Sequence, residues 1–224
     1  MLVAVGLERR CCVEAETVMI DDARVVALDI EENGEPLVDV RSIGLRVVEH
    51  HPRATSTAET RFSCRQAVAD RLVVADEELG DIDLVLAEGH RPLALQTLYW
   101  ETTMASLRET RPELNETETA NEAAKFIAPP SIVPPHSTGG AVDVILMRGD
   151  DELFMGSELN EQGEAMATDY PDLAPEYRQS RLLLVKSMHD AGFVNYGHEW
   201  WHYSYGDRYW AYATGGTAMY GAFS

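Results

Sequence analysis

Two short segments hold the residues whose types and spacing favour metal chemistry. The first is HSTGGAVD, which runs from His136 to Asp143. Imidazole and carboxylate groups are both good zinc ligands. On a plain strand a spacing of seven would put them on opposite faces, but Gly139-Gly140 allow a tight turn that could bring both to one centre. The alternative is a turn histidine and a strand aspartate without a metal.

The second segment is His198-Glu199-Trp200-Trp201-His202-Tyr203. Glu199 and His202 would share a face on a helix, where residues three apart are neighbours. The aromatic density instead favours a strand, on which the two would separate unless the strand bends or bulges. The alternative is an aromatic core strand whose polar residues face solvent.

Taken together, the two segments predict a catalytic zinc site. His136, Asp143 and His202 supply three ligands and leave a fourth position for water. Glu199, if it is not a ligand, could take a proton from that water. Arg91 follows a predicted buried strand and carries a fork of donors suited to an oxyanion or a carboxylate. A surface arginine is the alternative for Arg91.

Composition narrows the function classes. The 224 residues contain 18 Lys+Arg and 38 Asp+Glu, which gives a formal net charge of −20. This charge argues against binding nucleic acid or anionic lipid, because both require basic surface. The apolar runs are too short to span a bilayer, and the opening Met1–Leu7 run lacks the features of a signal peptide. We therefore expect no membrane partner and a cytoplasmic protein.

The cysteines point to the same compartment. Cys11, Cys12 and Cys64 are an odd number without regular spacing. They form neither a disulfide framework nor a CxxC metal site. We expect reduced thiols.

The elements that must position these residues follow from apolar periodicity and turn signals. Strands are expected over Arg24–Ile30, Leu37–Val40, Leu45–Val48, Leu84–Ala87 and Val142–Met147, with a further extended region over Phe193–Tyr212. Helices are expected over Arg61–Leu79, Leu93–Arg108 and Tyr177–Ala191. On the helix over Leu93–Arg108, the predicted inner residues are Leu95, Leu98, Tyr99 and Leu107. On the helix over Tyr177–Ala191, they are Leu182, Leu183, Val185 and Met188. Paired prolines predict a stiff, extended entry to His136. The pattern predicts a single compact α+β domain, with residues 1–35 as an N-terminal extension packed on a domain of residues 36–224.

The motifs, in their order, resemble the zinc D-alanyl-D-alanine dipeptidases, a family related to the zinc D,D-carboxypeptidases and the hedgehog-type fold. The resemblance covers roughly residues 36–212. It is carried by GHRP (Gly89–Pro92), HSTGGAVD, MGS (Met155–Ser157) and EWWH (Glu199–His202), with AGFVNY (Ala191–Tyr196) before the last.

The resemblance implies a central, mostly antiparallel sheet packed with helices around one Zn²⁺ per chain. By motif position, it implies His136, Asp143 and His202 as the ligands. Glu199 looks like the general base and later proton donor, and Arg91 looks like the group that stabilises the oxyanion. The implied partner is a small peptide, and the implied reaction is hydrolysis of D-Ala-D-Ala. The oligomeric state is not readable from the sequence.

Departures from the family concern the substrate. The family often has Asp and Tyr where this chain has Glu88 and His90. After the MGS segment, the family commonly has a Phe-Asp pair whose acid is associated with the ammonium group of the dipeptide. Leu159 and Asn160 occupy those positions here, which makes Asn160 a candidate substrate-binding residue, with Glu158 as a possible replacement acid.

Two alternative functions stay open at this stage. A D,D-carboxypeptidase or amidase acting on peptidoglycan fragments would not need an acid for a free amine. A non-catalytic, zinc-containing binding module is the alternative of another class. Retention of both Glu199 and Arg91 argues against the binding module, because a structural zinc needs neither a base nor an oxyanion donor.

Overall fold

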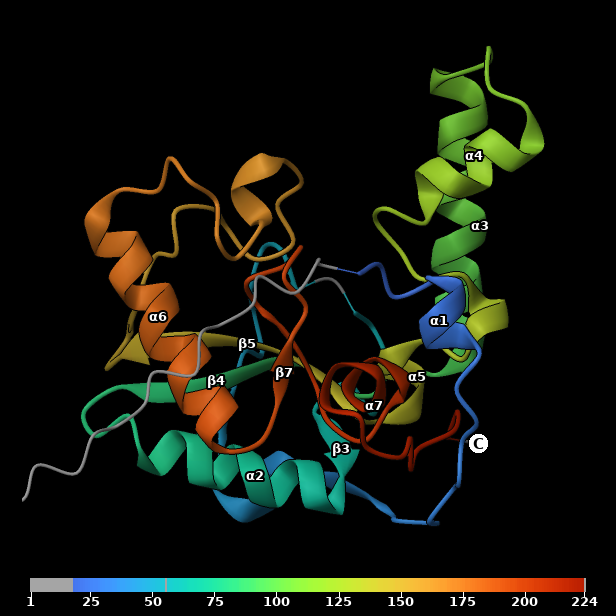
Figure 1. Ribbon diagram of the computed structural model, residues 1–224. Helices are drawn as coiled ribbons and strands as arrows, with labels where there is room; N and C mark the ends of the chain where they lie inside the picture. The colour runs from blue at the N-terminus through green and yellow to red at the C-terminus, as the bar shows by residue number, and fades with distance from the viewer. Residues whose placement is uncertain (1–17, 55, 224) are drawn as a thin grey trace, which may run out of the picture.

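A computed structural model describes residues 18–54 and 56–223, and its elements are drawn in Figure 1. The helices are α1 (Ala23–Val26), α2 (Gln66–Glu77), α3 (Leu93–Thr110), α4 (Glu116–Ala123), α5 (Pro135–Thr138), α6 (Pro175–Asp190) and α7 (Arg208–Thr214). The strands are β1 (Leu37–Asp39), β2 (Arg46–Val47), β3 (Ser63–Arg65), β4 (Asp83–Glu88), β5 (Ala141–Arg148), β6 (Asp151–Glu152), β7 (Val194–Asn195) and β8 (His202–Ser204). Short 3₁₀ turns cover Val40–Ile43, Pro130–Ile132 and Glu164–Met166.

The main sheet has the strand order β2-β4-β5-β8-β7, and β6 pairs with the end of β5. All its pairings are antiparallel except that of β2 with β4. A second, two-stranded sheet joins β1 and β3. This confirms the predicted α+β class and the mostly antiparallel sheet. The two central strands, β4 and β5, are almost wholly buried, in keeping with their continuous apolar sequences.

Helices α2 and α6 cover the sheet on the side away from the α3–α4 arm (Figure 1). On α2, the residues Val68, Leu72 and Ala75 recur at helical spacing and enter the main core, as an amphipathic helix requires. Helices α3 and α4 instead form an arm that rises from the body of the molecule (Figure 1). On α3 only Gln96 and Met104 are buried.

The prediction of a strand over Arg24–Ile30 is wrong. Residues Ala23–Val26 form the one-turn helix α1, and only Ile30 pairs in a β-bridge, with Ala218. The cause is local, because the Asp22 side chain accepts a hydrogen bond from the backbone N–H of Arg24 at 2.8 Å and caps the turn. Such capping outweighs the β-propensity of two valines.

The predicted buried faces of two helices are partly wrong. Leu98 on α3 is 55% exposed, because the arm has no core beneath that side. On α6, Leu182 is 61% exposed, whereas Leu184 and Arg181 are buried and Met188 is buried as predicted. The buried face of α6 therefore includes Arg181 and differs from the predicted apolar face.

Two expected extended segments are also wrong. The prolines before His136 lead into a short 3₁₀ turn and then into α5, because proline is well suited to the first turn of a helix. The region predicted as extended over Phe193–Tyr212 contains strands β7 and β8 but ends in α7, which begins after Asp207 caps its first turn.

The proposed division at residue 35 stays a prediction. Residues 1–17, including Cys11 and Cys12, lie outside the described residues, whereas Val18 and Val25 pack against Tyr196 and Tyr209. Cys64 is buried and has a free thiol. Within the described part of the chain, no helix combines the length and apolar character needed to cross a bilayer.

Candidate metal centre and active site

Three polar residues lie side by side across the middle of the main sheet. Asp143 on β5 is paired in register with His202 on β8 and with Glu88 on β4. Directly opposite residues of neighbouring strands point to the same face of a sheet. All three side chains are buried. The register therefore gathers on one face groups that lie 55 and 59 residues apart in the chain, counted from Glu88 to Asp143 and from Asp143 to His202.

His136 reaches the same face from helix α5, which ends at Gly139. Gly139 has a φ of +73°, in the left-handed region that favours glycine. A Cβ on Gly140 would lie 2.6 Å from the carbonyl oxygen of Tyr205. The two glycines therefore make the turn that the sequence predicts, and they return the chain into β5 with His136 facing Asp143.

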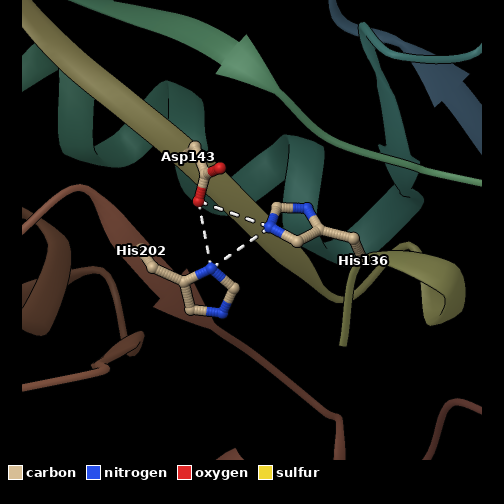
Figure 2. Close-up of side chains that lie close together, drawn as sticks. All are labelled: His136, Asp143 and His202. Atoms are coloured by element: carbon tan, nitrogen blue, oxygen red, sulfur yellow. Dashed lines mark hydrogen bonds and ion pairs between the residues drawn. The ribbon is translucent and has the colours of Figure 1, made fainter. Parts of the chain in front are cut away.

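The three side chains point toward one another (Figure 2). The Nδ1 atom of His202 lies 3.0 Å from Oδ1 of Asp143 and 3.2 Å from Nε2 of His136. The remaining edge, from His136 Nε2 to Asp143 Oδ1, is 3.3 Å. Ligand atoms around a tetrahedral ion with bonds of about 2.0–2.1 Å lie about 3.3–3.4 Å apart. The triangle matches that requirement within a few tenths of an ångström.

The hydrogen bonds around His136 support the same conclusion. Its Nδ1 atom lies 2.8 Å from the carbonyl oxygen of Gly89, so this nitrogen carries the proton and Nε2 presents a lone pair. A histidine ligand typically donates its other N–H to a carbonyl in this way. Two neutral imidazole lone pairs and a carboxylate that face one another within 3.3 Å repel unless a cation lies among them. The donor set therefore fits a divalent metal.

Glu199 lies in a turn just before β8. Its backbone N–H donates to the carbonyl oxygen of Tyr196 at 2.8 Å, and its own carbonyl accepts from Nδ2 of Asn195 at 3.1 Å. This turn brings Oε2 of Glu199 to 4.0 Å from Nδ1 of His202. Of the helix, the bend and the bulge considered from the sequence, the structure has the bend, because the polypeptide turns before the strand begins at His202.

The environment of Glu199 shifts the pKa of its carboxyl toward neutral pH. Burial raises the pKa of its carboxyl to about 7, while the nearby His202 and Arg91 act in the opposite direction. A general base works best when its pKa lies near the working pH. A cation among the three ligand atoms would lower this pKa, because an opposite charge favours the ionised carboxylate.

Arg91 is held rigidly beside the centre. Its Nε and Nη2 atoms donate to the two carboxylate oxygens of Glu88 at 2.8 and 2.7 Å, and Nη1 donates to Oε1 of Gln96 at 2.8 Å. Its backbone N–H donates to the carbonyl oxygen of His136 at 3.1 Å. A guanidinium has five N–H donors, so these three side-chain bonds leave two for another group. Arg91 is not a free surface residue.

A pocket of about 200 Å³ joins these groups. Its walls include all five residues predicted to carry the chemistry, namely Arg91, His136, Asp143, Glu199 and His202. Asn160 also lines it, with a φ of +57° and its Nδ2 atom donating to the carbonyl oxygen of Arg53 at 2.9 Å. Glu158 instead pairs with Arg53 at an exposed position. The pocket is smaller than the 300–1,000 Å³ typical of drug-sized ligands.

Sequence reasoning missed several residues of this pocket. Gln96 was not predicted. The feature that marks it is a polar side chain at a buried position of a helix. Tyr196 lies inside the quoted AGFVNY motif, and its ring centre is 5.9 Å from that of His202. Asp21 carried no signal, because it lies in a segment predicted to be peripheral. His90 and His198 lie outside the group formed by His136, Asp143 and His202.

Hydrogen bonds from Arg181 and Trp200 fix the loop that carries Asn160. The buried Arg181 guanidinium donates to the carbonyl oxygens of Met155 at 2.7 Å and Ala165 at 2.6 Å. In the MGS segment, Ser157 accepts a hydrogen bond from Nε1 of Trp200 at 3.0 Å. The loop is thereby tied to the residue that follows Glu199.

Several known proteins are similar to this chain. A curated D-alanyl-D-alanine dipeptidase from Synechocystis sp. is 29% identical over 212 residues, which cover 80% of this chain and 85% of that protein. Among solved structures, the LdcB LD-carboxypeptidase has a TM-score of 0.48 and 18% identity, covering 83% of this chain and 77% of its own. The vancomycin resistance D,D-pentapeptidase VanY, solved with Zn(II), has a TM-score of 0.42 and 15% identity, covering 87% of this chain and 96% of its own.

The family comparison covers the candidate ligands and the two candidate catalytic residues. The sequence pattern of peptidase family M15, described as D-Ala-D-Ala dipeptidase, matches residues 53–215. That range is well over half of the chain and includes the three candidate ligands, Glu199 and Arg91. The chain therefore belongs to the M15 family of D-Ala-D-Ala dipeptidases.

Proposed function

We propose that this peptidase hydrolyses the free dipeptide D-Ala-D-Ala at a single zinc ion, with Glu199 as the general base and Arg91 as the oxyanion donor. The observation that carries the proposal is the convergence, in one small pocket, of a ligand triangle, a base and a fixed cation. Each of these groups has a distinct task in hydrolysing an amide, and a structural metal site would need only the first.

The ion would be held by His136 Nε2, His202 Nδ1 and a carboxylate oxygen of Asp143. This set of two imidazoles and one carboxylate suits zinc. When bound, zinc supplies Lewis-acid polarisation of a carbonyl and makes a water molecule more acidic. We propose one ion per chain, because the described residues bring together one such triangle.

Glu199 moves the proton. Its carboxylate takes a proton from the attacking water and then delivers it to the nitrogen of the leaving amine. The distance of 4.0 Å between its Oε2 atom and Nδ1 of His202 supports a base that acts beside the ion without binding it. The hydrogen bonds of the preceding turn hold this position.

Arg91 stabilises the charge that develops on the carbonyl oxygen. Its two remaining N–H donors are fixed in direction, because Glu88 and Gln96 hold the other three. Donors that are oriented in advance do not reorganise during the reaction, and removing one such donor typically costs about 10²–10³ in turnover. Glu88 and Gln96 are positioning residues for this arginine.

Asn160, which follows the MGS segment, is the proposed substrate contact. Because its amide nitrogen is bonded to the Arg53 carbonyl, its oxygen is the atom left to accept a hydrogen bond. An amide carries no charge, so it binds an ammonium group more weakly than a carboxylate does. This observation also favours a second candidate, a D,D-carboxypeptidase acting on peptides without a nearby free amine.

Hydrolysis of D-Ala-D-Ala and of its N-acetylated analogue, with zinc content measured on the same preparation, tests the proposal. Cleavage of the free dipeptide supports a dipeptidase. Cleavage of the acetylated analogue alone would favour the carboxypeptidase. Bound zinc with neither substrate cleaved would contradict both and favour a binding module.

A cytoplasmic location remains a proposal based on the sequence. Fractionation of the cells that produce the protein, with a cytoplasmic and a secreted marker enzyme as controls, tests it. Recovery of the protein with the secreted marker would contradict it.

A further inference from the structure

We propose that Asp21 binds the ammonium group of the substrate and so makes the enzyme select free dipeptides over N-blocked peptides. This inference rests on the proposed function and names the substrate class of the same pocket. It assigns a specificity-determining role to a residue that lies outside the family match of residues 53–215.

The position of Asp21 follows from a well-anchored turn. The backbone N–H of Asp22 donates to the carbonyl oxygen of Met19 at 3.0 Å. The hydroxyl of Tyr196 contacts Sδ of Met19 at 3.4 Å, and Val18 packs on the same tyrosine. The Tyr196 ring in turn lies edge-to-face with the His202 ring, with ring centres 5.9 Å apart. The turn that carries Asp21 is therefore fastened to the wall of the metal centre.

The carboxylates of the pocket differ in what they face. Glu88 is occupied by Arg91, Asp143 belongs to the ligand triangle, and Glu199 is the base. Asp21 lines the pocket and is half-buried. Within residues 18–54 and 56–223, no hydrogen bond or ion pair involves its side chain. Asp21 is thus the carboxylate of this pocket that is left for a ligand.

Asp21 and Glu199 both act electrostatically on Tyr196. Burial raises the pKa of the Tyr196 hydroxyl, and the negative charges of Glu199 and Asp21 both raise it further. Both carboxylates line the same pocket as this tyrosine.

The chemistry of a dipeptide supplies the complementary charge. An α-amino group has a pKa of about 7.7–8.0, so most of it is charged at neutral pH. In a dipeptide this ammonium is attached to the carbon next to the scissile carbonyl, so it must lie close to the metal and the base. A carboxylate that meets an ammonium forms a charge-assisted hydrogen bond. An N-acetylated substrate would leave Asp21 desolvated and unpaired, which selects against it.

The test compares Asp21→Asn with Asp21→Glu and with Asp29→Asn. Asp29 is an exposed carboxylate of the same segment that does not line the pocket, so it is the matched control. Each zinc-loaded protein is assayed on D-Ala-D-Ala and on N-acetyl-D-Ala-D-Ala.

We expect Asp21→Asn to raise KM for the free dipeptide roughly 10- to 100-fold, as for loss of a hydrogen bond to a charged group. Its kcat/KM for the acetylated analogue should stay the same or rise. Asp21→Glu should restore part of the loss, and Asp29→Asn should match the wild type.

Binding provides a readout that does not depend on turnover. Calorimetric titration of D-Ala-D-Ala into Glu199→Ala, and into the same protein with Asp21→Asn, should give a Kd that rises by a similar factor. Equal losses on both substrates, or no loss on either, would overturn the role of Asp21. Binding that depends on Asp21 without hydrolysis by the wild type would contradict the proposed reaction alone. Absence of dipeptide binding would overturn both proposals.

Discussion

Acidification from about pH 7.5 to about pH 4.5 should destabilise the protein through His90, and the substitution His90→Asn should remove this part of the loss. The His90 side chain is buried. Its Nδ1 atom lies 2.8 Å from Oγ1 of Thr60, while its Nε2 atom has no hydrogen-bond partner among the described residues. A protonated ring would need partners for both nitrogens. Burial is the main cause that lowers the pKa of His90 to about 4.

The sign and size follow from the difference in proton binding. An unfolded histidine has a pKa of about 6.5, so between pH 6.5 and 4 the unfolded chain binds the proton and the folded protein does not. Stability contributed by neutral His90 is therefore complete above about pH 6.5 and falls as the pH decreases. At about 1.36 kcal/mol per pH unit, the loss by pH 4.5 is about 2–3 kcal/mol. For a chain of this length, that corresponds to a fall in Tm of about 5–10 °C.

Denaturant unfolding of the wild type and of His90→Asn at both pH values measures this effect. Asparagine can keep the hydrogen bond to Thr60 but does not titrate. Other groups also respond to acid, so the informative quantity is the difference between the two proteins in the stability lost. The wild type should lose about 2–3 kcal/mol more than the variant. Equal losses would refute the assignment of an acid-sensitive imidazole whose Nε2 atom has no partner among the described residues.

Further predictions concern the centre itself. Glu199→Ala should keep its zinc, measured by metal analysis, but lose about 10²–10⁴ in turnover, because general-base catalysis contributes about that much; near-normal turnover would remove Glu199 from the mechanism. His202→Ala should lower zinc occupancy after dialysis against a chelator, and full occupancy would show that the ligand assignment is wrong. Glu88→Ala should cost about 3–5 kcal/mol of unfolding free energy, because it leaves the buried Arg91 charge unpaired; an unchanged denaturation midpoint would contradict this account.

The parts of the site that could be predicted from the sequence are those set by local backbone geometry. His136 and Asp143 are separated by two glycines, one of which has a positive φ. Two adjacent glycines favour a tight turn, and the strand that follows them is strongly apolar. The buried strand before Arg91 has the same local character. For these residues, motif and propensity agree with the tertiary structure.

Pairings between distant residues could not be predicted in this way. The register that puts Glu88, Asp143 and His202 in one row is set by the contacts of three strands. No short segment of the sequence indicates this register. The turn at Glu199 depends on two hydrogen bonds. The backbone N–H of Glu199 donates to the carbonyl oxygen of Tyr196, and Nδ2 of Asn195 donates to the carbonyl oxygen of Glu199. The sequence left a helix, a bend and a bulge open for this segment, and the bend follows only from these hydrogen bonds.

Errors in the fold arose where tertiary context outweighs composition. The segment Arg24–Ile30 was predicted as a strand because of its valines, but the capping Asp22 makes Ala23–Val26 a one-turn helix. Leu98 looked like a core residue because its helix has an apolar composition, but that helix extends into an arm without a core on that side. Asp21 was overlooked because it belongs to a segment predicted to be an accessory extension, and only folding brings it to the pocket wall.

The pairing of β5 with β8 has a consequence for how the protein matures. His136 and Asp143 emerge from the ribosome close together, but they form only two corners of the triangle until His202 arrives 59 residues after Asp143. A tight metal complex therefore has to wait for the last strand pairing of the central sheet. Zinc uptake during synthesis would then report that this long-range pairing has formed, and metal supply would act on the final step of folding rather than on its start.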